Sequence, residues 1–84
     1  MADPVDRSDL AITDEVFNQV LLESGERLLV FFKFGHLPGR LQIISSRFGL
    51  LAAFLVENIA SSAERTVALR KLLESKDAAV RAAL

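Results

Sequence analysis

Apolar residues keep a helical spacing from Leu41 to Ile59, and this feature restricts the possible folds of the chain more than any other. They recur every three or four residues and consist of Leu41, Ile44, Phe48, Leu51, Ala52, Leu55 and Ile59. The spacing matches the period of an α-helix and predicts a helix of about five turns. Pro38 precedes the stripe and suits the first residue of that helix, where no backbone N–H is required.

The same helix carries two further faces. Ile43, Leu50 and Phe54 form a second apolar face. A stripe of small or polar residues, which lets another helix approach closely, consists of Gln42, Ser46, Gly49 and Ala53. A simple two-helix hairpin covers only one apolar face. We therefore expect either the N-terminal segment or another subunit to cover the second one.

A second long helix is predicted from about Ser62 to the C-terminus. Ser61 and Glu64 have the spacing of a capping box, which marks the start of a helix. Its buried side consists of Leu69, Leu72, Leu73, Ala79, Val80 and Ala83. Opposite charges four residues apart add weak support, and these pairs are Arg70–Glu74 and Asp77–Arg81. The short polar turn between the long helices predicts an antiparallel helical hairpin over residues 35–84.

A shorter helix is predicted from Asp14 to Ser24. Thr13 is a suitable N-cap residue, and Gly25 is a suitable C-cap residue. Apolar residues recur between them at helical spacing and are Val16, Phe17, Val20 and Leu21. Residues 1–12 precede this helix, and we expect them to form a flexible acidic arm.

The segment from Glu26 to Phe34, with the sequence ERLLVFFKF, is ambiguous. Its β-branched and aromatic residues favour a strand, whereas its unbroken apolar run favours a buried turn of helix. No other segment resembles a strand that would pair with it, so we interpret it as a helical or extended connector. The expected fold class is therefore all-α. Residues 13–34 form the short N-terminal helix with its connector, and residues 35–84 form the hairpin.

The chain has 84 residues, which fit one small domain with a thin core, because so short a chain buries only about 60–65% of its unfolded surface. Yet 51% of its residues are hydrophobic, and it has no cysteine for a disulfide. We therefore expect a homo-oligomer. The lack of cysteine suits a reducing cytoplasm. No membrane partner is expected, because the longest apolar run is too short and the acidic N-terminus does not resemble a signal peptide.

The net charge of −1 conceals an asymmetry between the two parts of the chain. Residues 1–26 have a net charge of −6, and residues 27–84 have a net charge of +5. We expect the acidic segment to lie against the basic remainder, or the basic remainder to meet an anion. The basic excess is too small and too interspersed for binding to duplex DNA, so no DNA partner is expected.

No catalytic constellation is apparent, so we expect no enzyme and no cofactor. A single histidine and the absence of cysteine exclude a Cys–His nucleophile pair and most transition-metal sites. Gly35, Gly39 and Gly49 do not match a phosphate-binding loop or a dinucleotide fingerprint.

The stretch FFKFGHLPGRLQ, from Phe31 to Gln42, holds the main candidates for ligand binding. Its three phenylalanines could stack on a flat ring, and Phe34 is the preferred one because it lies nearest the polar residues. His36 could hydrogen-bond a base or a phosphate. Each has a structural alternative, which is core burial for the phenylalanines and a backbone contact at the helix start for His36.

Arginines provide a second set of candidates. Arg40 and Arg47 are seven residues apart on one helix face, where they could clamp a phosphate. Arg65, Arg70 and Lys71 could act in the same way from the second long helix. The structural alternatives are solvated helix edges, pairs with the acidic N-terminal segment and salt bridges within the helix pair.

Residues 31–84 resemble a group of small phage proteins that are common in phages of actinobacteria. The shared pattern is roughly F-K-Y-x-H-L-P, L-Q-x-x-S, L-A, E-R-x-x-A-L-R-K-L-L and K-D-A-A-V-R-A, and its most specific part here is the ending ERTVALRKLLESKDAAVRA. This group is similar to the helical-hairpin domain shared by phage anti-CBASS and anti-Thoeris sponge proteins. Those proteins oligomerise and sequester cyclic nucleotide second messengers made by bacterial immune systems.

The resemblance implies a non-enzymatic sponge that acts in the cytoplasm of an infected bacterial host, with ligand pockets between its subunits. The residues that it implies are Phe34, His36, Leu37, Pro38, Gln42, Glu64 and Arg65, and Arg70 joins them as a further arginine candidate. The chain departs from the pattern at Phe34, Gly35 and Ala60, where tyrosine, an acid and proline are usual. The alternative is a phage interaction or scaffolding module that uses the second apolar face and binds no small molecule.

Overall fold

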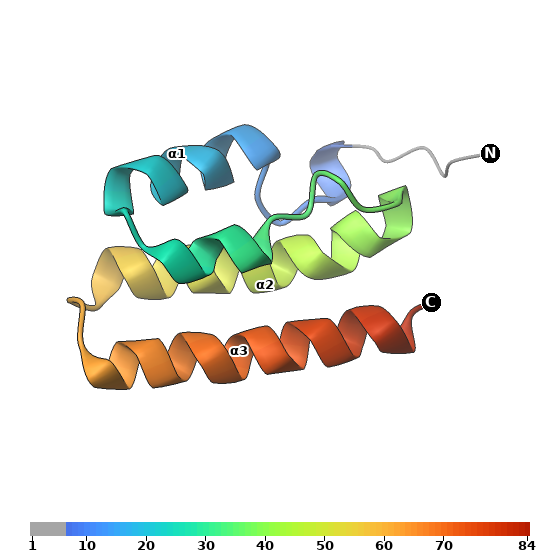
Figure 1. The fold of residues 1–84 in the computed structure, drawn as a ribbon. Coiled ribbons are helices and arrows are strands. Elements are labelled where there is room, and N and C mark those ends of the chain that lie inside the picture. The colour runs from blue at the N-terminus through green and yellow to red at the C-terminus, as the bar shows by residue number, and fades with distance from the viewer. Residues whose placement is uncertain (1–6) are drawn as a thin grey trace.

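The computed structural model describes residues 7–84, and every regular element within them is a helix. Three α-helices and two short 3-10 helices follow one another along the chain (Figure 1). Their bounds are η1 Arg7–Asp9, α1 Asp14–Ser24, η2 Arg27–Phe32, α2 Gly39–Asn58 and α3 Ala63–Ala82. The all-α fold with two long packed helices, α2 and α3, is confirmed.

The ends of α1 are those predicted from the sequence. Thr13 Oγ1 accepts a hydrogen bond from the backbone N–H of Val16 at 3.3 Å. At the other end Gly25 has a left-handed backbone with φ of 66°, and its N–H donates to the Leu21 carbonyl. A side chain is strained in that conformation, which is why glycine suits this position. The predicted helix from Asp14 to Ser24 is confirmed.

The ambiguous segment after α1 is the 3-10 helix η2. The Glu26 carboxylate caps it by accepting a backbone N–H at 3.3 Å. Residues three apart lie on the same side of a 3-10 helix, so Leu29 and Phe32 are both buried, whereas Val30 and Phe31 are exposed. The buried side packs against α2 and α3. This packing accounts for the unbroken apolar run without a partner strand.

The helices α2 and α3 lie antiparallel and form the predicted hairpin (Figure 1). Polar contacts join them at both ends. Arg65, near the start of α3, donates to the Ile59 carbonyl at 2.8 Å. Arg40, near the start of α2, donates to the Ala83 carbonyl at the end of α3. These contacts hold the two helices alongside each other at opposite ends of the hairpin.

Two helix starts lie one residue away from their predicted positions. Pro38 is the N-cap of α2, with ψ of 150°, rather than its first residue. Ser62 caps α3 and accepts the backbone N–H of Arg65 at 3.1 Å. The predicted capping box of Ser61 and Glu64 is therefore wrong, because Glu64 is the second residue of the helix and not the third.

The ion pairs predicted along α3 do not form among residues 7–84. Asp77 pairs with its neighbour Lys76 at 2.8 Å rather than with Arg81. No ion pair joins Arg70 to Glu74 in this part of the chain. Exposed pairs of this kind gain little free energy in water, so their absence leaves the helix unaffected.

Two phenylalanine rings fill the contact between α1, the connector and α2. The rings of Phe17 and Phe34 have centroids 6.0 Å apart and planes at 61°, which is an edge-to-face arrangement. Both lie against Gly49, where an added Cβ would come within 3.5 Å of each ring. The stripe of small residues on α2 is thus the side on which α1 and the connector pack.

The described part of the N-terminal arm also packs on α2. The backbone N–H of Ala11 donates to Ser46 Oγ at 3.1 Å, and Arg47 Nη1 donates to the Asp9 carbonyl at 3.2 Å. Ile12 is buried in the core. Residues 7–12 therefore differ from the expected flexible arm because Ile12 has a place in the core. Residues 1–6 of the arm lie outside the described residues.

The second apolar face of α2 is left partly uncovered by this arrangement. Leu50 is 44% exposed and Phe54 is 56% exposed. The sequence allowed two ways of covering this face, and in the described part of the chain the N-terminal segment covers it only in part.

By length and composition, α2 also meets the criterion for a helix that crosses a membrane, and it is the one such helix within residues 7–84. The elements α1, η2 and α3 all pack on it, which makes it the central helix of the fold. That no membrane partner exists stays a prediction.

Candidate functional site

Phe34 lies in the core rather than at a surface. Its side chain is 0% exposed and lies between Phe17 and Gly49. The chain leaves η2 with an extended backbone at Lys33, and the next ring turns inward. A fully buried ring has no face free for stacking on a ligand. The assignment of Phe34 to a binding site is therefore corrected to a core position.

The turn between η2 and α2 holds the next predicted residues. His36 and Pro38 are exposed, and Leu37 is half-buried. Gln42, in the first turn of α2, donates from Nε2 to the carbonyls of Leu37 at 2.9 Å and Gly35 at 3.3 Å. Gln42 therefore holds the turn in place, while the imidazole of His36 is presented to solvent.

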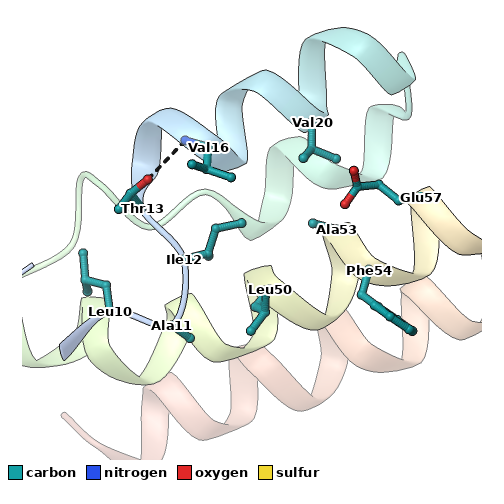
Figure 2. A pocket seen from close by; sticks show the side chains of 10 residues that line it. All are labelled: Leu10, Ala11, Ile12, Thr13, Val16, Val20, Leu50, Ala53, Phe54 and Glu57. Carbon is teal, nitrogen blue, oxygen red and sulfur yellow. Dashed lines mark hydrogen bonds between the residues drawn. The ribbon is translucent and has the colours of Figure 1, made fainter. Parts of the chain in front are cut away.

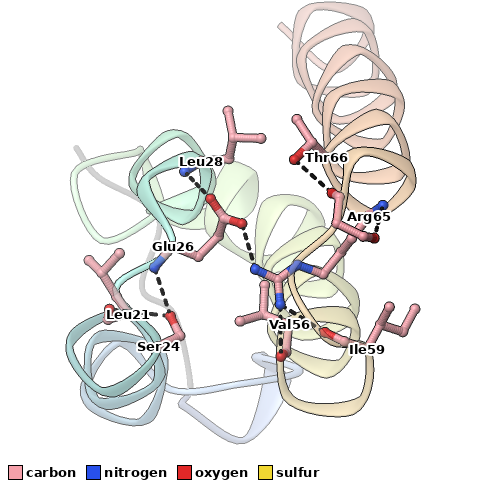
Figure 3. Close-up of polar contacts among 9 residues, drawn as sticks. Leu21, Ser24, Glu26, Leu28, Val56, Ile59, Arg65 and Thr66 are labelled. Atoms are coloured by element: carbon pink, nitrogen blue, oxygen red, sulfur yellow. Dashed lines mark hydrogen bonds and ion pairs between the residues drawn. The ribbon is translucent and has the colours of Figure 1, made fainter.

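Arg65 forms a buried polar cluster at the other end of the hairpin (Figure 3). Its Nη2 lies 2.8 Å from Glu26 Oε1, and its Nη1 donates to the carbonyls of Ile59 at 2.8 Å and Val56 at 3.4 Å. Arg65 is 8% exposed. One guanidinium thus joins the start of η2, the end of α2 and the start of α3. The acidic segment and the basic remainder meet in this pair, which gives Arg65 a structural role.

A single chain does not bring the predicted binding residues together. His36 lies before the N-terminus of α2, and Arg65 lies after its C-terminus. The helix between them has 20 residues, which corresponds to about 30 Å at 1.5 Å per residue. Arg70 is exposed on α3 and has no ion-pair partner within residues 7–84. A site that combined these residues would need more than one subunit.

A pocket of about 390 Å³ opens between the connector and the C-terminal half of α3. It includes His36 and Leu37 from the predicted set. We name it the basic pocket, and its lining consists of Val30, Phe31, Lys33, His36, Leu37, Lys76, Asp77, Val80 and Arg81. Lysine and arginine contribute three positive charges to this lining, and aspartate contributes one negative charge.

The polar groups of the basic pocket favour an anion. Asp77 is held by Lys76 at 2.8 Å, so Lys33 and Arg81 have no carboxylate partner in the described part of the chain. Phe31 stands beside them with 58% of its surface exposed. An exposed aromatic ring can stack on a flat ring of a ligand, while guanidinium and ammonium groups bind phosphate oxygens. The pocket therefore combines the two contacts that a nucleotide needs.

Sequence reasoning missed Lys76 and Arg81 and preferred Phe34 to Phe31. Lys76 and Arg81 could not be connected with His36 because only the packing of α3 against the connector brings them together. The choice between the two rings depended on the backbone of the connector. The spacing of Leu29 and Phe32 was the available signal, since a 3-10 helix that buries both turns Phe31 outward.

No protein-family model matches this chain, and neither a curated protein nor a solved structure matches it. Within residues 7–84 no group of three or more potential metal-ligating side chains lies together.

Proposed function

We propose that the protein binds a nucleotide-like ligand in the basic pocket and holds it without chemical change. The observation that carries this proposal is the exposed ring of Phe31 beside Lys33, His36 and Arg81 in one pocket. Its volume of about 390 Å³ falls within the range of about 300–1,000 Å³ typical of small-molecule sites.

Each side chain has a separate part in this binding mode. Phe31 stacks on the base, and such stacking contributes about 1–3 kcal/mol per base. Arg81 and Lys33 neutralise phosphate charges through charge-assisted hydrogen bonds. His36 offers ring nitrogens to a base edge or to a phosphate. Val80 and Leu37 form the apolar wall.

The pocket is suited to capture rather than to reaction. Its described lining contains no serine, threonine, cysteine or tyrosine that would act as a nucleophile. Its one carboxylate, Asp77, is engaged by Lys76. Tight capture needs only complementary contacts.

The biological form of the proposal is sequestration of cyclic nucleotide immune messengers by a phage protein in its bacterial host. The resemblance of residues 31–84 to phage sponge proteins supports this form. A cyclic dinucleotide offers two bases and two phosphates, so a symmetric homo-oligomer could present two copies of the basic pocket to it. A sponge must outcompete the host receptor, so we expect a Kd of about 1 nM or lower, near −12 kcal/mol.

The test is native mass spectrometry of the purified protein with a panel of cyclic dinucleotides, cyclic trinucleotides and cyclic ADP-ribose isomers. One ligand bound at fixed stoichiometry supports the proposal. The variant Phe31→Ala should weaken that binding about 10-fold or more. Leu22→Ala is the control, because Leu22 is also a large, exposed apolar side chain but lies outside the pocket and outside α2.

A second pair of variants separates the pocket from general positive charge. Arg81→Ala should weaken binding about 10-fold or more, because a hydrogen bond to a charged group contributes about 1.5–3 kcal/mol. Arg27→Ala removes the same charge from an exposed position of η2 outside the pocket and should leave binding unchanged. Equal losses in both variants would contradict the assignment of the pocket.

An interaction or scaffolding role is the second candidate function, and the exposed Leu50 and Phe54 favour it. This role predicts that no ligand from the panel binds. It also predicts that Phe54→Glu abolishes the interaction with the partner protein and that Phe31→Ala has no effect on it.

A further inference from the structure

Five residues follow one another along α2 at alternating intervals of four and three, and all except the half-buried Ile43 are exposed. We name them the α2 seam, and they are Ile43, Arg47, Leu50, Phe54 and Glu57. Residues at these intervals lie in one row along a helix, and such rows form the contact line of paired helices. The seam is apolar at its centre and carries opposite charges on either side of that centre.

The apolar centre of the seam is partly open to solvent. Leu50 and Phe54 are about half exposed, and α1 lies beside them (Figure 2). A pocket of about 430 Å³ runs between α1 and α2 here and includes Val16, Leu50 and Phe54. Among its described lining residues, Glu57 is the one charged side chain.

The two charged residues of the seam have no charged partner within residues 7–84. Arg47 Nη1 donates to the carbonyls of Ile43 at 2.6 Å and Asp9 at 3.2 Å, which carry no net charge. Glu57 is exposed and forms no ion pair with any residue in that part of the chain. Ten residues separate them along α2, about 15 Å at 1.5 Å per residue, so they do not pair with each other within one chain.

The positions of Arg47 and Glu57 are complementary when the α2 helices of two copies lie antiparallel. Arg47 lies three residues before Leu50, and Glu57 lies three residues after Phe54. In an antiparallel pair of α2 helices related by a two-fold axis at the height of residue 52, Leu50 lies opposite Phe54 of the partner subunit. The same axis places Arg47 opposite Glu57 of the partner subunit, twice per dimer.

We infer that the protein forms a symmetric homodimer in which the α2 seams of two copies pack antiparallel, with Arg47 against Glu57 of the partner subunit. A parallel, in-register pair would instead place like charges opposite each other, which is unfavourable. The second copy covers the apolar face that the N-terminal segment leaves open.

This inference does not depend on the proposed ligand. The basic pocket is lined by the connector, its turn and the C-terminal half of α3, and it contains no residue of the α2 seam. Dimerisation and ligand binding can therefore fail separately.

The test uses two charge reversals, Arg47→Glu and Glu57→Arg, and their mixture. Each variant alone creates two like-charge pairs across the axis and should dimerise about 10-fold or more weakly than the unmodified protein. An equimolar mixture restores both opposite-charge pairs across the axis. Native mass spectrometry, which resolves the two chains by mass, should show a 1:1 heterodimer in the mixture and predominantly monomer for each variant alone.

Controls separate the interface from folding. Arg70→Glu reverses a charge on α3 outside the seam and should leave the dimer unchanged. Glu57→Arg tests the seam without disturbing the contact of Arg47 with Asp9. Circular dichroism of every variant should retain the helical spectrum. The inference would be overturned if the unmodified protein were monomeric both at full concentration and after 100-fold dilution. A mixture that forms no heterodimer would overturn it as well.

Discussion

Phe31 and Phe34 lie three residues apart, and yet one ring is mostly exposed to solvent whereas the other is completely buried against Phe17 and Gly49. The 3-10 helix η2 ends between them, and the extended backbone at Lys33 changes the side on which the next ring lies. The two rings therefore have different roles, one at the surface of the basic pocket and one in the core.

We expect this difference to appear in stability. Phe34→Ala leaves a cavity in the core and should lower the free energy of unfolding by about 3–5 kcal/mol. Phe31→Ala removes a surface ring and should change it by about 0.5 kcal/mol or less. Urea unfolding followed by circular dichroism measures both, since the chain has no tryptophan. Equal losses in the two variants would contradict the burial that the fold assigns to them.

Gly49 is expected to tolerate a methyl group and nothing larger. An added Cβ would lie 3.5 Å from the rings of Phe17 and Phe34, an ordinary van der Waals distance. Gly49→Ala should therefore raise the free energy of unfolding by up to about 1 kcal/mol, because alanine favours a helix interior over glycine.

The larger variant Gly49→Leu is the counterpart. It should lower the free energy of unfolding by about 1–3 kcal/mol through overpacking against the two rings. The same unfolding assay compares both variants with the unmodified protein. A destabilised alanine variant would show that the contact between α1 and α2 is closer than the structure gives.

The buried pair of Arg65 and Glu26 is expected to act as a coupled unit. Arg65→Ala leaves Glu26 Oε1 and two carbonyls without their donor and should lower the free energy of unfolding by about 3 kcal/mol. Glu26→Ala should also destabilise. The double variant should lose less than the sum of the two single losses, because the second change removes a charge that the first left unpaired. Additive losses would indicate that the pair is not coupled.

The start of α3 offers a comparison of neighbouring serines. Ser62 accepts the backbone N–H of Arg65, whereas Ser61 precedes the cap. Ser62→Ala should lower the free energy of unfolding by about 1 kcal/mol, and Ser61→Ala should leave it nearly unchanged. The reverse order would restore the capping box that the sequence pattern predicts.

Local patterns predicted the parts of the fold that depend on neighbours in the chain. Thr13, Gly25 and the apolar row between them defined α1 to the residue, because caps and helical periodicity involve residues within one or two turns. The start of α3 was displaced by one residue, because Ser61 and Ser62 both have the chemistry of an N-cap and only the backbone conformation chooses between them.

The candidate site was less accessible to sequence reasoning. His36 and Leu37 were identified from the turn sequence and do line the basic pocket. Lys76 and Arg81 were not identified, because α3 supplies them from a distant part of the chain. Arg65 was identified as a ligand-binding candidate, but its guanidinium is held in a buried cluster with Glu26.

Spacing along the chain was enough to predict an all-α fold, the approximate bounds of the three α-helices and more apolar surface on α2 than a hairpin can cover. Those properties follow from residue spacing, caps and helix propensity, which are local. The packing of the helices determines which face of α2 contacts α1, which phenylalanine stays exposed and which charges surround the basic pocket. Burial and pocket composition depend on contacts between segments far apart in the sequence, and these contacts exist only after the helices have packed.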